Sequence, residues 1–336
     1  MLNGFIEIKI NMLTWNIILF LISLYILVKA SQSVVKYILA IADFLNISDY
    51  VAALLIMSLA TTLPEFVVGI NSAIGGFSNL SLGNLFGANI ANISLVLGLS
   101  AFLSGNIKTV GRAPKYHIWP ALLTSISPII LLLDGSLTRN DGLILISIFF
   151  IYCFFLIFGR SFIKKEHDIL SKIRSSKEKT THHYLFLNKN IGGFIISVFL
   201  LLLSAYVLTL NASSIALSLN ISEILIGIFV IAIGTTLPEL SISLRSAFSK
   251  HPGLSIGNLV GASVFNSTLI LGVVALINPI AIIGNDFKSF IIASIFMVLC
   301  IIVANIFLTT GRKIGRFEGL MLMFIYVLFI FSNIIL

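Results

Sequence analysis

Long runs of apolar residues, separated by short polar breaks, make up most of the chain. About 20 apolar residues in helical conformation cross the hydrocarbon core of a bilayer, so each run is predicted to be a membrane-spanning helix. The pattern predicts an all-α polytopic membrane protein with ten such helices. They are expected over residues 12–40, 50–76, 81–104, 117–134, 140–159, 190–219, 222–248, 254–278, 288–310 and 315–336.

Two features of the first run test this count. Lys29 and Lys36 interrupt it, which leaves open two short spans there and eleven in total. The run is too long for the apolar part of a signal peptide and no small-residue cleavage site follows it, so we expect it to remain in the mature protein.

The composition supports the membrane interpretation. Of 336 residues, 58% are hydrophobic and 10% are charged, whereas soluble domains carry roughly 25% charged residues. The 2 cysteines exclude a disulfide scaffold, and no Cys/His cluster has zinc-site spacing. No cofactor, nucleic-acid partner or obligatory protein partner is indicated, and the expected surroundings are the lipid bilayer.

The net charge of +8 is better explained by topology than by nucleic-acid binding. With ten spans and the polar segment 160–189 in the cytoplasm, 18 Lys and Arg residues lie inside and 3 lie outside (Lys9, Arg139 and Lys288). This distribution fits the positive-inside rule, and eleven spans would spoil it. We therefore expect a multi-pass protein of the cell (plasma) membrane, with both termini outside and 160–189 as a basic cytoplasmic linker.

The chain also contains an internal repeat. Ser58–Gly98 and Ala232–Gly272 align without gaps at an offset of 174, with 18 of 41 positions identical. The copies fall on the second and third spans and on the seventh and eighth, so five spans separate them and they cross the membrane in opposite directions. Secondary transporters use such inverted repeats, with the binding site where the repeats meet. The expected organisation is 1–159 (first five-helix repeat), 160–189 (linker) and 190–336 (second five-helix repeat).

The repeated polar residues indicate a cation site. Glu65 and Glu239 are the only acids well inside predicted spans, where each costs about 2.5–3.5 kcal/mol. Pro64 and Pro238 cannot donate a backbone hydrogen bond, so each loosens the helix just before its glutamate. A buried ion pair, or protonated acids held by hydrogen bonds, are the alternatives, but no basic residue lies at a comparable depth.

Neutral oxygen atoms accompany the two acids. Thr61, Thr62, Thr235 and Thr236 share a helix face with the glutamates. In the following helices, Asn84, Ala88 and Asn92 form an i, i+4, i+8 stripe that Asn258, Ala262 and Asn266 repeat. Carboxylate, hydroxyl and carbonyl oxygens suit Ca²⁺ and sodium-like ions, whereas zinc and copper prefer His or Cys.

TTLPE followed by GNxxGAxxxN, present twice, resembles the two alpha repeats of the cation/calcium exchanger superfamily, most closely its prokaryotic sodium/calcium exchangers. The resemblance implies Ca²⁺ antiport against Na⁺ by alternating access, with Glu65 and Glu239 as the central ligands. The further metal-binding positions that it implies are Thr61, Thr62, Thr235, Thr236, Asn92 and Asn266.

The chain departs from that family pattern at several positions. The family commonly has serine at the positions of Thr62 and Thr236, where a hydroxyl survives, and at Ala88 and Ala262, where none does. Many members have aspartate where Asn266 stands. These changes leave Ca²⁺/H⁺ exchange, or exchange of another divalent cation, as the alternative to Ca²⁺/Na⁺ exchange. An ion channel is less favoured, and no nucleophile–base pair suggests an enzyme.

Overall fold

The computed structural model describes residues 2–44, 50–108, 119–158, 183–219, 221–248, 253–282, 284–310 and 313–335. Most of the linker expected over 160–189 lies outside these residues. Its last part, from His183 onward, already belongs to the first helix of the second half.

Helices account for nearly all of the described first half. They are α1 (Leu2–Phe44), α2 (Tyr50–Thr61), α3 (Leu63–Ile74), α4 (Ser78–Ile90), the π-helical turn η1 (Ala91–Val96), α5 (Leu97–Ser104), α6 (Trp119–Thr124), α7 (Ser127–Leu131), the 3₁₀ turn η3 (Leu132–Asp134) and α8 (Arg139–Phe158). α1 continues without a break through Lys29 and Lys36, so the alternative of two short spans in this segment is wrong.

The second half begins in the same order, with a long helix, a broken helix and a helix that contains a π-helical turn, and it ends with two long helices. Its helical elements are α10 (His183–Leu219), α11 (Glu223–Ile226), the π-helical turn η5 (Gly227–Ile231), α12 (Ala232–Thr235), α13 (Leu237–Phe248), α14 (Gly253–Val264), the π-helical turn η6 (Phe265–Ile270), α15 (Leu271–Ile277), α16 (Asn285–Thr310) and α17 (Arg316–Ile335).

Seven helices in the described ranges are long and apolar enough to cross a membrane. Two more spans result if each bent pair counts as one, and Trp119–Asp134 is a shorter apolar helix. Large apolar side chains such as Phe155, Phe199 and Phe324 are exposed on the outward helix faces. Since water would penalise such surfaces and lipid would not, the protein is a multi-pass membrane protein.

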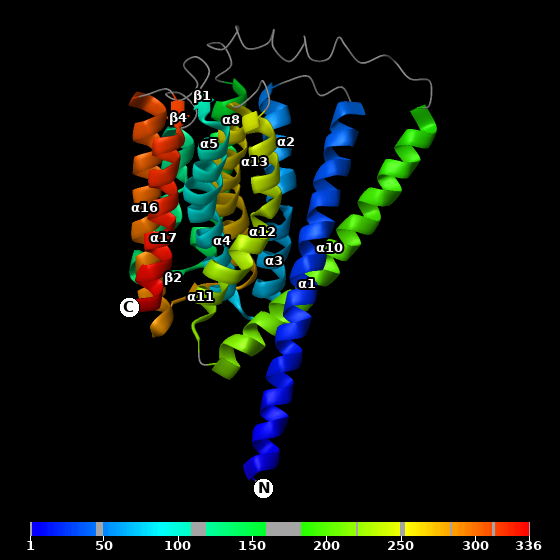
Figure 1. The fold of residues 1–336 in the computed structure, drawn as a ribbon, viewed down its shortest axis with the longest axis vertical. Coiled ribbons are helices and arrows are strands. Elements are labelled where there is room, and N and C mark those ends of the chain that lie inside the picture. The colour runs from blue at the N-terminus through cyan, green and yellow to red at the C-terminus, as the bar shows by residue number, and fades with distance from the viewer. Residues whose placement is uncertain are drawn as a thin grey trace.

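The helices form a bundle with α1 and α10 on one side of it (Figure 1). α1 begins and α17 ends at the same end of the bundle, and α10 begins at the opposite end (Figure 1). α1 and α10 pack mainly on each other, with Leu27, Leu201 and Leu208 buried between them and their neighbours.

Two short antiparallel strand pairs connect the halves. β1 (Asn106–Lys108) pairs with β4 (Lys313–Gly315), with Ile107 opposite Ile314. β2 (Ser136–Leu137) pairs with β3 (Ile280–Ala281), with Leu137 opposite Ile280. β1 and β4 lie at the end of the bundle where α10 begins, and β2 lies towards the other end (Figure 1). Each half therefore contributes one strand to each pair.

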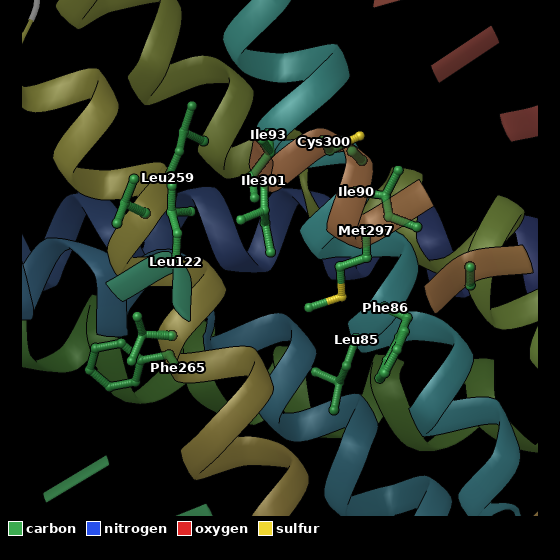
Figure 2. Close-up of a cluster of buried hydrophobic side chains, with 14 of the residues drawn as sticks. Leu85, Phe86, Ile90, Ile93, Leu122, Leu259, Phe265, Met297, Cys300 and Ile301 are labelled. Carbon is green, nitrogen blue, oxygen red and sulfur yellow. The ribbon is translucent and has the colours of Figure 1, made fainter. Parts of the chain in front are cut away.

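The main apolar core surrounds the middle of the repeated helices. Leu85 and Phe86 from α4 and Phe265 from η6 lie in one cluster with Met297 and Ile301 from α16 (Figure 2). The Phe86 and Phe290 rings contact each other in a tilted arrangement, with centroids 5.6 Å apart and 59° between the ring planes. This core fixes α4 relative to the α14–η6 segment, and these elements carry Asn84, Asn258 and Asn266.

Glycines allow close contact between helices of the two halves, α5 with α17 and α15 with α8. A Cβ at Gly98 in α5 would lie 2.8 Å from the Gly319 carbonyl oxygen in α17. In the same way, a Cβ at Gly272 in α15 would lie 2.8 Å from the Gly142 carbonyl oxygen in α8. Positions 98 and 272 differ by the repeat offset of 174, and their partners at 142 and 319 differ by 177, so the two contacts join corresponding helices of the two halves.

Candidate cation-binding site

Both repeated TTLPE motifs fold as helix breaks. α2 ends at Thr61 and α3 begins at Leu63, with a bend of 51° between their axes. The bend between the helical segment ending at Thr235 and α13 is 45°. Each proline is thus the second residue of a new helix, where a missing N–H leaves no hydrogen bond unmade. The loosening expected from the prolines is confirmed as a sharp change of direction just before each glutamate.

The two glutamates are fully enclosed at these breaks. Glu65 and Glu239 are each 0% exposed, and none of their four carboxylate oxygens has a hydrogen-bond partner among the described residues. The two carboxylates lie near enough to each other to interact electrostatically, and each lies near a threonine of the opposite repeat, Glu65 near Thr235 and Glu239 near Thr61. The acids from the two halves therefore share one buried polar centre, as expected from the repeat.

The four threonines divide into two kinds. The Thr235 hydroxyl donates to Asn84 Oδ1 at 3.2 Å and the Thr61 hydroxyl donates to Asn258 Oδ1 at 3.4 Å, so each reaches the opposite repeat. The Thr62 hydroxyl donates to the Ser58 carbonyl at 2.9 Å, and that of Thr236 donates to the Ile233 carbonyl at 3.1 Å. Thr61 and Thr235 also lie within hydrogen-bond distance of own-helix carbonyls, those of Ser58 at 3.1 Å and Ala232 at 3.2 Å. All four hydroxyls can therefore bond within their own helix, and only the first threonine of each pair also reaches the opposite repeat.

Asn92 and Asn266 lie in the π-helical turns η1 and η6, which occupy repeat-related positions. Both side chains are 0% exposed. Within the described part of the chain, both polar atoms of Asn92 and the Oδ1 of Asn266 lack a hydrogen-bond partner. π-helical turns inside α-helices are frequent at functional sites because they re-aim side chains.

Asn84 and Asn258 join the site although sequence analysis did not assign them as ligands. Both are 0% exposed, and each accepts a threonine hydroxyl from the opposite repeat. The signal was present, since both belong to the repeated asparagine stripe. Gly83 and Gly87 allow this arrangement, because a Cβ at either would lie under 3.0 Å from backbone atoms of Ile224 or Ile228.

The unpartnered oxygens decide what the centre can bind. An orphaned buried acceptor costs about 1–3 kcal/mol, more for a charged one. The two carboxylates and the amide oxygens of Asn92 and Asn266 all lack a partner among the described residues. The described residues contain no group of three or more His, Cys, Asp or Glu side chains, so a soft-metal site is not formed among them. Carboxylate and amide oxygens are the ligands that hard cations prefer.

Comparison with known proteins agrees with this chemistry. The sequence matches the family described as sodium/calcium exchanger protein over residues 15–158 and 189–335. The chain belongs to this family. Its members are cation exchangers of the membrane and are transporters, not enzymes.

Individual relatives cover nearly the whole chain. The sodium/calcium exchanger MaX1 of Methanosarcina acetivorans is 28% identical over 350 residues, covering 95% of this chain and 98% of its own. A solved structure of the sodium-calcium exchanger NCX_Mj, soaked with Na⁺ and Sr²⁺, is 27% identical with a TM-score of 0.63, covering 95% of this chain and 99% of that chain. The H⁺/Ca²⁺ exchanger CAX has the same fold, with 18% identity, a TM-score of 0.72 and coverage of 95% of this chain and 86% of that chain.

Proposed function

We propose that this protein is a secondary active antiporter that exchanges Ca²⁺ for Na⁺ by alternating access, with the ion held between Glu65 and Glu239. The observation that carries the proposal is the pair of buried, unpartnered carboxylates from opposite repeats. The names of MaX1 and NCX_Mj support the choice of ions.

The architecture proposed is ten spans in two inverted five-helix repeats. Seven long helices, two bent pairs and the shorter Trp119–Asp134 helix supply ten candidates. Repeat-related π-helical turns and glycine contacts support the duplication. The strand pairs support inversion, because β1 and β3 begin at residues 106 and 280, which differ by the repeat offset, yet belong to different pairs at different ends.

The orientation follows from the basic residues. We place the 160–189 linker in the cytoplasm and both termini outside the plasma membrane. The two ends of the described chain lie at one end of the bundle (Figure 1), as an even number of spans requires. On this orientation the antiporter extrudes Ca²⁺ from the cytoplasm when Na⁺ enters.

The proposed mechanism uses two groups of helices. The broken helices and the asparagine-bearing helices hold the ion. α1 and α10 pack mainly on each other and form their own apolar cluster with neighbouring helices, and we propose that this pair slides across the ion-binding core. Sliding of the pair exposes the site to one side of the membrane and then to the other.

Proton-coupled exchange is the second candidate, and a specific observation favours it. Ala88 and Ala262 are buried at positions where the family commonly has serine, so two hydroxyl oxygens that could bind Na⁺ are absent. Protons need only the two carboxylates. The fold shared with CAX is compatible with either counter-ion.

The test is transport in proteoliposomes. We expect an imposed Na⁺ gradient to drive ⁴⁵Ca²⁺ uptake by the wild type, and Glu65→Gln and Glu239→Gln to abolish it. Glu318→Gln is the matched control, since Glu318 bonds the Gly315 backbone away from the site. Uptake driven by a pH gradient and indifferent to Na⁺ would establish the proton-coupled alternative. Normal uptake in both glutamine variants, or single-channel currents without a counter-ion, would refute the antiport site.

A further inference from the structure

Three side chains form a hydrogen-bonded chain across the two halves. Asn89 in α4 donates through Nδ2 to Ser267 Oγ at 2.7 Å, and Asn266 donates through Nδ2 to Asn89 Oδ1 at 3.1 Å. Asn89, Asn266 and Ser267 are 1%, 0% and 2% exposed. In the absence of water, each such bond strongly fixes the orientation of its amide.

The chain leaves one atom of Asn266 free. Its amide nitrogen is used by Asn89, and its Oδ1 has no partner in the described residues. The bond to Asn89 fixes which side of the amide carries the NH₂ group, and the carbonyl oxygen on the other side is the acceptor that can bind a cation. Asn266 is thereby prepared to bind a cation before the cation arrives.

The repeat provides an internal comparison. By the offset of 174, Asn92 corresponds to Asn266, but the counterparts of Asn89 and Ser267 are Ser263 and Ile93. The Ser263 hydroxyl donates to the Leu259 carbonyl within its own helix at 3.0 Å. Asn92 accordingly has neither amide atom bonded.

We infer that Asn89 is a positioning residue that turns the Asn266 carbonyl oxygen towards the transported cation, so that the second repeat supplies a fixed amide ligand and the first an adjustable one. This inference rests on the proposed function. Pre-orientation lowers the cost of binding because no bond has to be broken or made when the ion enters.

The experiment measures Ca²⁺ transport and thermal stability for Asn89→Ala, Asn266→Ala and their double variant. We expect Asn89→Ala to raise the half-saturating Ca²⁺ concentration about 5- to 10-fold, the effect of losing one orienting hydrogen bond. Maximal rate should change less than twofold. In the Asn266→Ala background, Asn89→Ala should add nothing, because the residue that it positions is gone. Ser267→Ala should shift the half-saturating concentration in the same direction by a smaller factor.

Ser263→Ala is the matched control, since it removes the repeat counterpart of Asn89 and should transport normally. If Asn89→Ala does not fold, Asn89→Ser places the counterpart's own residue there and is judged by the same criteria. A half-saturating concentration equal to that of Ser263→Ala, or lower than wild type, overturns the inference, as does an additive effect in the double variant. Loss of transport in Glu65→Gln with a normal Asn89→Ala refutes this inference alone, whereas normal transport in Glu65→Gln refutes the proposed function.

Discussion

The glycine contacts between the halves allow a quantitative test of the fold. Replacing Gly98 by alanine would put a Cβ 2.8 Å from the Gly319 carbonyl oxygen, and replacing Gly272 would put one 2.8 Å from the Gly142 carbonyl oxygen. Ordinary van der Waals contact begins at 3.4 Å, so each methyl group is about 0.6 Å too close (3.4 minus 2.8). The obstacle is backbone, which cannot change rotamer, so the helices must separate.

Separation of packed helices has a known cost. Over-packing by one methyl group typically destabilises a protein by about 1–3 kcal/mol. Applied to a chain of this size, that loss lowers the unfolding midpoint by roughly 2–8 °C. Gly98→Ala and Gly272→Ala should behave alike, since the two contacts join corresponding helices of the two halves and have equal distances.

Thermal unfolding of detergent-purified protein measures the effect. Gly192→Ala is the control, because a Cβ at Gly192 in α10 meets nothing within 4 Å. Alanine is the better helix former, so this variant should be unchanged or slightly more stable. Midpoints of Gly98→Ala or Gly272→Ala that match Gly192→Ala would show that the helix contact in question is not made.

Three further changes test the site and its surroundings. Thr61→Val should weaken Ca²⁺ binding several-fold, whereas Thr62→Val should change it little, because only the Thr61 hydroxyl also reaches an asparagine of the opposite repeat. Equal affinities of the two variants by isothermal titration would contradict the distinction. Asp286→Ala should lower the thermal unfolding midpoint by several degrees, because this carboxylate accepts hydrogen bonds from Asn79 at the start of α4 and from Ser222 at the start of α11. An unchanged midpoint would mean that these bonds contribute nothing to stability. Pro64→Ala should slow transport several-fold by letting the helix continue through its 51° bend, and a wild-type rate at saturating Ca²⁺ would remove the bend from the mechanism.

Sequence patterns predicted the parts of the fold that depend on local chemistry. Lengths of apolar runs located the long helices, and proline next to glutamate located both helix breaks. The buried position of Glu65 and Glu239 followed from their place inside apolar runs. These results depend on hydrophobicity and on the missing proline N–H, which a sequence states directly.

The parts that could not be predicted depend on contacts between distant segments. Adjacent threonines in TTLPE look equivalent in sequence, and both bond the Ser58 carbonyl, yet only Thr61 also reaches Asn258. Their directions differ because successive residues of a helix point about 100° apart, and only the packing of the opposite repeat decides which direction meets a partner. The pairing of Asn89 with Asn266 has the same origin, since 177 residues separate them.

Charge in the buried centre gives a physical reason for obligatory exchange under the proposed function. With both carboxylates ionised and no cation bound, the site would carry a charge of −2, because no basic group among the described residues acts on either glutamate. Burying such charge uncompensated is very costly, so a transporter that must occlude its site to reorient can do so only when loaded. One Ca²⁺, two Na⁺ or two protons each bring the charge to zero. The asparagines are neutral, so the charge that the bound ions must balance stays at two. Because the enclosed site excludes water, it cannot reorient while empty, and the movement of one ion is thereby linked to that of the other.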